Sequence, residues 1–420
     1  MENSKNGESP RRWNTLKMAK LGSRRAKRAK TGAASTAWEL WRSFGAPRYA
    51  AAPMVWQSER CFRLLARRNG VGLAYTPMVN ARSFVESYAP KRDSATRQRS
   101  GEDEWRYDTF RNVRSDVFPN DAADRPLVLQ FCATNAEEFA AAASLASREF
   151  GSCIDMIDLN LGCPQRSARL ARFGAFLMDE AQLVAKMVKS AVVAAAPLPV
   201  SAKIRVLDSV EATVRFSLLL EAAGASVIAI HGRTRSQRHH EGSVHVATIA
   251  AVVQAVSIPV IANGAVRTRL EAEAMLARTG AACCMAATGL LADISLFRPP
   301  LVNPDDVEEE GEEEKKKKKN GEDDGAFGRA FEYLAAAKEC PPPHHRFIKD
   351  HILALLRNDY LSRTDDPLYH MIVRQRGVTE LHQYYELVRI LARRESQSEP
   401  EPERELWSLK EVKLARVGKE

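Results

Sequence analysis

The sequence predicts an α/β protein: a (β/α)8 TIM barrel followed by a small all-helical C-terminal domain. Two observations predict the barrel: the chain carries eight short apolar runs, and amphipathic helical spacing follows most of them. Continuous apolar runs are typical of buried parallel strands, and eight such strands close into a barrel of about 250 residues. A doubly wound open sheet is the alternative, weakened because no G-x-G-x-x-G follows the first run.

The expected elements alternate along the chain. Strands are expected at residues 48–55, 71–79, 126–132, 156–162, 200–206, 226–232, 259–264 and 281–289. Helices are expected at residues 59–68, 136–150, 210–223, 246–256 and 270–278, and also after Asp179. Between residues 326 and 394, leucine, histidine and arginine recur at helical spacing, which predicts the helical domain.

Composition excludes several classes of protein. The chain has 420 residues, of which 45% are hydrophobic, enough for a large buried core. It has no uninterrupted run of about 18 apolar residues, so we expect no membrane-spanning helix. No apolar stretch follows the basic N-terminus, so we expect no secretory signal. Lysine and arginine number 62 against 53 acidic residues, and the net charge of +9 favours a polyanionic partner.

The seven cysteines indicate the compartment. Their odd number and the absence of C-x-x-C spacing argue against a disulfide scaffold and against a zinc ribbon. We therefore expect no metal site and an intracellular protein, in the cytoplasm or the nucleus. From the lack of a long apolar run we expect no membrane association. Targeting to an organelle by the basic N-terminus stays open.

Changes in composition divide the chain into five parts. They are a disordered basic arm over residues 1–38, the barrel over 45–300, a low-complexity charged insertion over 303–327, the helical domain over 328–395 and a charged tail over 396–420. For the basic run of the arm, a nuclear import signal, an organelle transit peptide and an RNA-contacting tail are open interpretations.

Polar residues gather at the predicted carboxyl ends of the strands, where a barrel places its chemistry. They are Pro53 and Met54, Gln130, Asn160 and Cys163, Lys203 and Arg205, His231, Asn263 and Gly264, and Thr288 and Gly289. Singly, each has a plain structural interpretation: Lys203 can snorkel, His231 can be a hydrogen-bonded core histidine, and Cys163 can be packing. A buried lysine without a partner is costly, however, and so many polar residues at one rim predict a site.

The residue types indicate what this site binds. Glycine turns after the seventh and eighth strands are the common phosphate cradle of barrels. Gln130, Lys203 and His231 supply donors and acceptors that suit a planar polar ring over the barrel mouth. An isoalloxazine fits, because Lys203 can stabilise negative charge near N1 and the C2 oxygen of a reduced flavin.

Eight short motifs occur at or near these strand ends. They are A-P-M-V at 52–55, Y-T-P-M at 75–78, Q-F-C at 130–132, D-L-N-L-G-C-P-Q at 158–165, F-G-A-F-L at 173–177, K-I-R at 203–205, H-G-R-T at 231–234 and A-N-G at 262–264. Together they resemble the tRNA-dihydrouridine synthases, most closely the eukaryotic 16/17 branch, over residues 49–297. N-L-G-C-P-Q and G-A-F-L are the most specific.

The resemblance implies an activity: reduction of the C5=C6 bond of a uridine in the D-loop of tRNA, at positions 16/17, with FMN as cofactor and NADPH or NADH as donor. It implies that Cys163 is the acid that protonates C5, because a thiol with an ordinary pKa of about 8.5 is mostly protonated at pH 7.

The resemblance also implies the binding residues. Those for FMN are Pro53, Met54, Val55, Gln130, Asn160, Lys203, His231, Asn263, Gly264, Ala265, Ala287 and Thr288. Those for tRNA are Arg205, Arg233, Arg235, Arg238, Arg346 and Lys349, the last two in the helical domain. We expect a monomer whose partner is tRNA.

Two other functions stay open. Another FMN barrel oxidoreductase, similar to dihydroorotate dehydrogenase and acting on a small metabolite, is compatible with the flavin residues, although the helical domain and the basic charge argue against it. A non-catalytic tRNA-binding protein is favoured only by the stretch Met285–Gly289, where many members of the family have a Gly-Arg-Gly phosphate clamp.

Overall fold

The computed structural model describes residues 32–88, 122–237, 242–299, 325–356 and 380–396. The chain forms two compact units. The first combines Met1–Pro53 with Val71–Ala287, and the second combines Met54–Gly70 with Thr288–Glu420. The segment Met54–Gly70, which the sequence assigned to the barrel, thus belongs to the same unit as the C-terminal helices.

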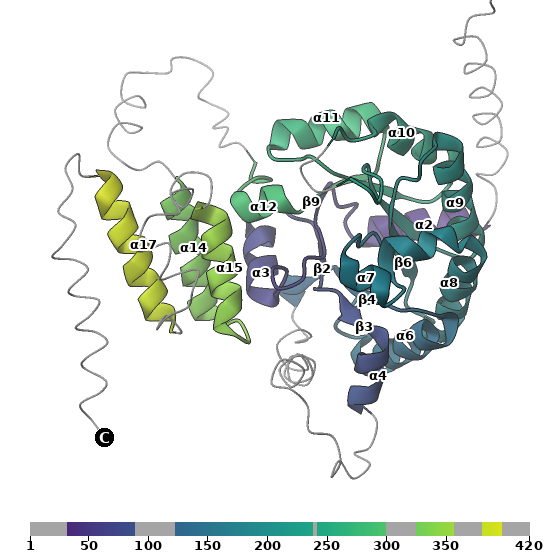
Figure 1. Ribbon diagram of the computed structural model, residues 1–420, viewed down its shortest axis with the longest axis horizontal. Helices are drawn as coiled ribbons and strands as arrows, with labels where there is room; N and C mark the ends of the chain where they lie inside the picture. The colour runs from purple at the N-terminus through teal and green to yellow at the C-terminus, as the bar shows by residue number, and fades with distance from the viewer. Residues whose placement is uncertain (1–31, 89–121, 238–241, 300–324, 357–379, 397–420) are drawn as a thin grey trace, which may run out of the picture. The chain divides into compact units, whose positions relative to one another are not determined.

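The first unit is a closed parallel barrel, as predicted (Figure 1). Its eight strands are β1 Tyr49–Ala51, β2 Leu73–Tyr75, β4 Leu127–Cys132, β5 Met156–Leu161, β6 Val200–Arg205, β7 Val227–His231, β8 Val260–Asn263 and β9 Cys283–Ala286. Neighbouring strands pair in parallel, and β2 pairs with both β1 and β4, which closes the sheet. Each strand lies within one of the eight predicted runs.

The second predicted strand, residues 71–79, is divided in the structure. β2 ends at Tyr75, and a further short strand, β3 Val79–Asn80, pairs with the carboxyl end of β4. Pro77 lies between them and has no backbone N–H to donate to a sheet, so a continuous strand is disfavoured there. The helix α4 Ala81–Tyr88 follows β3.

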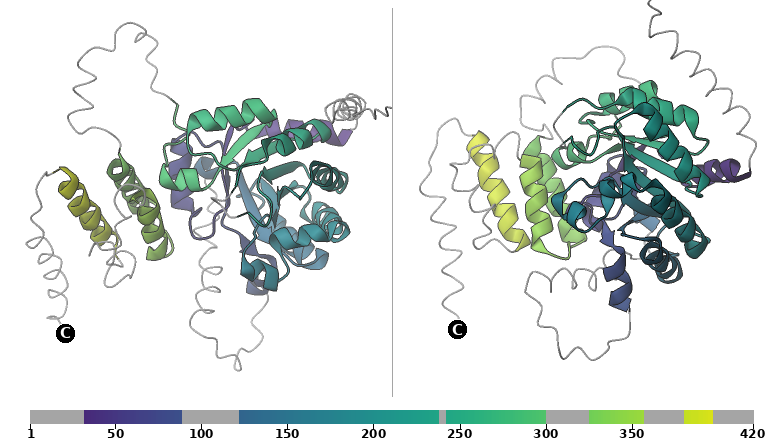
Figure 2. Two further views of the ribbon diagram at one scale, coloured as in Figure 1. Left: turned by 45° about the horizontal axis from the view of Figure 1, so that its top comes forward. Right: turned by 45° about the vertical axis from the view of Figure 1, so that its right-hand side comes forward.

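Helices surround the strands (Figure 2). They are α6 Ala136–Phe150, α8 Ala181–Ala195, α9 Val210–Ala222, α10 Val246–Ala255 and α11 Arg269–Thr279, with the short α7 Arg166–Leu170, η1 Ala122–Asp124 and η2 Gly174–Asp179 between strands and helices. Local sequence sets their ends. Asn135 caps α6 by accepting from the N–H of Glu138 at 2.9 Å, and Thr268 with Glu271 forms a capping box at α11.

The helix α2 Gly32–Ser43 overlaps the predicted basic arm, residues 1–38. Trp41 is buried, and the indole N–H of Trp38 donates to the carbonyl of Ser257 at 2.8 Å. The burial of Trp41 and the hydrogen bond of Trp38 therefore attach this segment to the barrel. Residues 1–31 lie outside the described residues, as do residues 303–324 of the charged insertion and 397–420 of the tail.

The second unit is helical, as predicted for the C-terminal part. Its helices are α3 Arg60–Arg68, α12 Thr288–Ala292, α14 Ala326–Glu339, α15 His345–Leu356 and α17 Leu381–Ser396. α14 packs against α3, α15 and α17. Buried Glu59 accepts from Tyr333 Oη at 3.1 Å and pairs with His351 Nε2 at 3.0 Å. Among the described helices of the chain, none is long and apolar enough to cross a membrane.

Candidate active site

The polar side chains of β6 face the interior of the barrel. Lys203 donates from Nζ to Oδ1 of Asn263 on β8 at 3.1 Å, although β7 lies between these two strands. A contact between non-neighbouring strands of a barrel runs through its interior. Side chains alternate along a strand, so Ser201 shares the inward face with Lys203. Asp158 on β5 lies in register with Ser201.

Asp158 is the centre of a buried hydrogen-bonded set. Its Oδ1 accepts from Ser201 Oγ at 2.6 Å, and its Oδ2 accepts from Nε2 of Gln130 at 2.8 Å. All three side chains are fully buried. Burial raises the pKa of Asp158 to about 6, while the two hydrogen bonds and the charge of Lys203 oppose the rise. The carboxyl group is therefore mostly ionised at neutral pH.

Asn160 connects this set to the loop after β5. Its Nδ2 donates to Oε1 of Gln130 at 2.9 Å. Its Oδ1 accepts from the backbone N–H groups of Gly162 and Cys163, both at 3.1 Å. The side chain of Asn160 thus fixes the backbone that carries the predicted acid.

The thiol of Cys163 is half-buried just beyond the end of β5. It packs against an apolar cluster of Cys132, Ala168 and Phe173. Burial raises the pKa of Cys163 above its ordinary value, although the positive charges of Arg205 and Lys203 and a backbone hydrogen bond lower it. The thiol is therefore protonated at neutral pH, as a proton donor must be.

Gly174 holds the backbone of η2 against the Cys163 loop. It has a φ of +68°, and a Cβ there would lie 2.7 Å from the carbonyl oxygen of Cys163. The same carbonyl accepts from the N–H of Ala175 at 3.0 Å. The glycine of the F-G-A-F-L motif is needed both for its left-handed backbone and for this close approach.

Lys203 places a positive charge at the mouth. Burial lowers the pKa of Lys203 to about 8, Arg205 adds to the decrease, and Asp158 opposes it. The ammonium is therefore still mostly charged at pH 7. Asn263, its acceptor, is held in turn because its Nδ2 donates to the carbonyl of Met285 at 2.8 Å.

Gly264 and His231 complete the rim on the side of β7 and β8. Gly264 has a φ of +128°, and a Cβ there would lie 3.0 Å from His231 Cδ2. Glycine therefore lets the turn approach the imidazole, and the next residue, Ala265, also has a positive φ of 54°. The donors of this rim are an ammonium, an imidazole and side-chain amides, which suit the carbonyl and ring-nitrogen acceptors of a flavin. The residues present thus fit the group that the sequence predicts.

Arg205, predicted to contact tRNA, is buried and bonds to backbone. Its Nε donates to the carbonyl of Gly162 at 2.7 Å, and its Nη1 donates to those of Thr234 at 2.8 Å and Gln237 at 3.3 Å. Burial lowers the pKa of Arg205 to about 10. Its guanidinium therefore joins the loop after β5 to the loop after β7.

The loop after β7 carries the other predicted arginines of this unit. Arg233 is buried. Arg235 is exposed, pairs with Asp179 at 2.6 Å and lies 5.1 Å from the ring centroid of Phe176. Arg238 lies outside the described residues.

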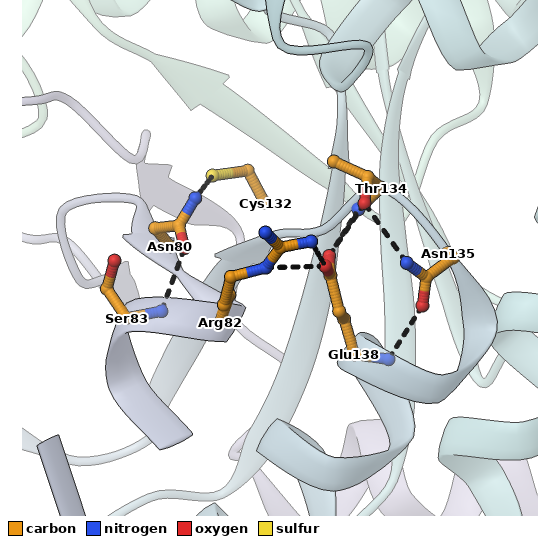
Figure 3. A network of polar contacts seen from close by, with 7 residues as sticks. All are labelled: Asn80, Arg82, Ser83, Cys132, Thr134, Asn135 and Glu138. Carbon is orange, nitrogen blue, oxygen red and sulfur yellow. Dashed lines mark hydrogen bonds and ion pairs between the residues drawn. The ribbon is translucent and has the colours of Figure 1, made fainter. Parts of the chain in front are cut away.

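A polar network lies beside the apolar cluster, at the carboxyl end of β4 (Figure 3). Glu138 accepts from Arg82 Nε at 2.8 Å and from the hydroxyl of Thr134 at 2.7 Å. Asn80 donates to the sulfur of Cys132 at 3.9 Å. Together these contacts tie α4 and β3 to the start of α6.

The remaining predicted residues lie at the rim of the first unit or in the second unit. Pro53 ends the first segment of the barrel unit, and Ala287 follows β9. In the second unit, Met54 bonds through its N–H and carbonyl to Ser58 Oγ, both at 3.0 Å, and Val55 is exposed. Thr288 begins α12.

The predicted tRNA residues of the helical unit differ in exposure. The Arg346 guanidinium lies 4.7 Å from the ring centroid of Trp56 and its side chain is 43% exposed. The side chain of Lys349 is only 16% exposed. Both cations pair with Asp350, Arg346 at 3.5 Å and Lys349 at 3.9 Å. Arg346 is the better placed of the two for contact with phosphate because more of its side chain is exposed.

Three residues of the site were not singled out from the sequence. Gly174 begins the G-A-F-L motif and Asp158 lies two residues before N-L-G-C-P-Q, but the partners of both are set by tertiary contacts. Ser201 had no local signal, because a serine in an apolar run has no distinctive spacing. Only the register of β5 with β6 brings its hydroxyl to the carboxylate.

Comparison with known proteins identifies relatives of the barrel. The family described as Dihydrouridine synthase (Dus) matches residues 50–320. A Rattus norvegicus protein described as tRNA-dihydrouridine(16/17) synthase-like is 41% identical over 63% of this chain and 56% of its own length. The Saccharomyces cerevisiae tRNA-dihydrouridine(16/17) synthase is 37% identical over 48% of this chain and 42% of its own length.

A human relative is covered more completely. This protein, described as tRNA-dihydrouridine(20a/20b) synthase-like, is 36% identical over 59% of this chain and 69% of its own length. The chain spans about half the length of the rat and yeast relatives. The resemblance inferred from the motifs is confirmed: with a family match over more than half of its residues, the chain belongs to the dihydrouridine synthase (Dus) family.

Proposed function

We propose that this protein reduces a uridine in the D-loop of tRNA, at position 16 or 17, to dihydrouridine, using FMN and either NADPH or NADH. The observation that carries the proposal is the half-buried thiol of Cys163 just beyond the end of β5, at the mouth of a barrel whose interior presents Lys203. The names of the rat and yeast relatives support the substrate and the two positions.

The reaction adds two hydrogens to adjacent carbons. The C5=C6 bond of uracil is conjugated with the C4 carbonyl, so addition of hydride at C6 develops negative charge at C5 and O4. FMN, when bound and reduced by NADPH or NADH, supplies that hydride. The thiol of Cys163 gives its proton to C5, and solvent returns a proton to the sulfur afterwards.

The other residues bind and orient. Lys203 and His231 hold the electron-rich edge of the cofactor ring, and Gln130 and Asn160 offer it amide groups. Gly264, Ala265 and Ala287 belong to the turns proposed to hold the phosphate.

Two further predicted cofactor residues of the barrel unit, Pro53 and Asn263, are assigned to the cofactor ring in this proposal. Base extrusion from a loop costs a few kcal/mol, and phosphate contacts offset it. We assign these contacts to Arg233, Arg235, Arg238 and Arg346, with residues 328–395 as the tRNA-binding domain. A monomeric protein of the cytoplasm or nucleus is part of the same proposal.

The experiment is mass-spectrometric mapping of tRNA taken from cells that lack this protein. The full chain is incubated with this tRNA, FMN and NADPH. We expect one D-loop uridine to gain two hydrogens, and no gain when NADPH is omitted.

Two outcomes would overturn the proposal. Turnover of a free pyrimidine without tRNA would indicate an oxidoreductase for a small metabolite. Protein that never acquires FMN, yet binds tRNA with a steep dependence on salt, would indicate a non-catalytic RNA-binding protein.

A further inference from the structure

The buried carboxyl group of Asp158 has no part in the chemistry described above. It lies inside the barrel, two residues before Asn160 along β5, and its side chain is fully buried. Burying an ionised carboxylate is costly unless its hydrogen bonds repay the cost. Among the described residues, the side chains of Ser201 and Gln130 donate hydrogen bonds to it. The bond from Gln130 therefore supplies a large part of the stabilisation of the buried charge.

The hydrogen bonds from Asp158 to Cys163 have one direction throughout. An ionised carboxylate can only accept, so Gln130 must turn Nε2 toward it. Oε1 of Gln130 then faces Asn160, which must donate to it from Nδ2. That leaves Oδ1 of Asn160 facing the loop, where the N–H groups of Gly162 and Cys163 can only donate.

The carboxylate of Asp158 at one end and the backbone N–H groups of the loop at the other therefore fix the orientation of both side-chain amides. The nitrogen and oxygen ends of a side-chain amide have almost the same shape, so packing alone does not select between them. If both amides were flipped, Nδ2 of Asn160 would face the loop N–H groups, which cannot accept a hydrogen bond. Oε1 of Gln130 would then face the carboxylate of Asp158. An unsatisfied buried polar group is among the costly defects of a folded protein.

We propose that Asp158 is a positioning residue, which acts through Gln130 and Asn160 to give the backbone N–H groups of the Cys163 loop an acceptor and so holds the proton donor in place. This inference rests on the proposed function for the role of Cys163. The charged and titratable neighbours of the carboxyl group are Lys203 on β6 and Tyr75 on β2. With a pKa of about 6, Asp158 stays an obligate acceptor at pH 8.

The test exchanges acceptor and donor between two positions. Gln130→Leu alone removes the amide group that joins Asp158 to Asn160. In Gln130→Glu with Asp158→Asn, the new amide at position 158 donates from Nδ2 to the carboxylate introduced at position 130 and accepts from Ser201. That carboxylate in turn accepts from Asn160. The double variant thus restores the acceptor at the loop without restoring either original side chain.

Two single variants of Asp158 complete the set. Asp158→Asn keeps an acceptor for Gln130, because only that orientation also satisfies the loop. Asp158→Leu has a similar size and removes the acceptor. The same two readouts apply to every variant at pH 8: dihydrouridine formation on tRNA, and the rate at which iodoacetamide alkylates Cys163, followed by mass spectrometry of its peptide without cofactor or tRNA.

We expect Gln130→Leu and Asp158→Leu to lose about tenfold in turnover and to alkylate at Cys163 about threefold faster, since the loop is less restrained. Asp158→Asn should stay within about threefold of the native protein in both readouts, and the double variant should do so in the alkylation rate, which is measured without cofactor. If Asp158→Leu fails to fold, the alkylation rates of Gln130→Leu and the double variant decide.

The proposal is overturned if the double variant alkylates at Cys163 as fast as Gln130→Leu, or if Cys163 alkylates at one rate in every variant. Failure of the proposed function gives a different result. In that case the native protein makes no dihydrouridine, while the alkylation rates still report whether Asp158 controls the loop.

Discussion

At the scale of single residues, the candidate site depends on backbone as much as on side chains. Cys163 is held through both of its backbone groups: its N–H donates to Asn160, and its carbonyl accepts from Ala175. The thiol is already mostly protonated at neutral pH with an ordinary pKa, and burial raises that pKa further. Changes that move the backbone of this residue should therefore reduce activity without touching the sulfur.

Gly174→Ala tests this dependence. The added Cβ would lie 2.7 Å from the carbonyl oxygen of Cys163 on a backbone with a φ of +68°. We expect turnover to fall by about tenfold or more, because small displacements of a reacting group are costly. Gly45→Ala is the matched control: its φ is +79°, but nothing lies within 4 Å of the new Cβ.

The control separates strain from contact. Both substitutions place an alanine in the left-handed region, which costs about 1–2 kcal/mol of unfolding free energy. Only the one at residue 174 should affect turnover. Equal losses of activity in the two variants would show that general destabilisation, and not the contact with Cys163, is responsible.

Asp158 gives a pH dependence of stability. Its pKa is raised from 3.8 to about 6, so the folded state binds a proton more tightly than the unfolded chain does. The contribution of this tighter proton binding to the free energy of unfolding is present below pH 4 and is lost as the pH rises through 6. Relative to Asp158→Asn, the native protein should lose at most ~3 kcal/mol of unfolding free energy between pH 4 and pH 8.

Urea unfolding of both proteins across this range measures the difference. Other titrating groups are common to the two proteins and largely cancel. A difference that stays constant with pH would mean that the carboxyl group at position 158 has an ordinary pKa in the folded protein.

At the scale of elements, loops after different strands are joined by buried side chains. Arg205 at the end of β6 bonds to carbonyls of the loops after β5 and β7. Glu138 in the first turn of α6 similarly accepts a hydrogen bond from Arg82 of α4. Arg205 and Glu138 thus connect short segments of the rim through hydrogen bonds that involve a charged side chain.

Arg205→Lys keeps the positive charge. The lysine ammonium, however, lacks the planar set of donors with which the guanidinium bonds to three carbonyls at once. We expect faster amide hydrogen exchange at residues 162–163 and 234–237, with a lower kcat at a nearly unchanged KM for tRNA. Arg148→Lys, at an exposed ion pair with Glu149, should change neither. A higher KM with native hydrogen exchange would instead support the direct tRNA contact that the sequence predicted.

At the scale of the whole molecule, sequence patterns predicted the barrel and its strands well, since buried parallel strands have a distinctive apolar signature. They also predicted the rim residues, because strand ends converge in a barrel. The patterns could not predict what each rim residue bonds to. Arg205 shows this: an arginine after an apolar run has the same sequence signal whether it bonds to phosphate or to backbone.

Binding of tRNA by the whole protein should depend on salt through individual cations. Arg346→Ala is expected to weaken binding and to lower the slope of log affinity against log salt concentration by about 1. Lys349→Ala, at a mostly buried side chain, should change the slope less. Equal slopes in the native protein and both variants would place the phosphate contacts elsewhere.

The role of Cys163 is tested most directly by a single turnover of the reduced, FMN-loaded protein with tRNA, followed by flavin absorbance. Cys163→Ala should keep its flavin and fold but slow the reaction by about 100-fold or more. Cys340→Ala, at the other half-buried cysteine among the described residues, should react like the native protein. A Cys163→Ala protein that reacts within about threefold of the native rate would contradict the assignment of this thiol as the proton donor.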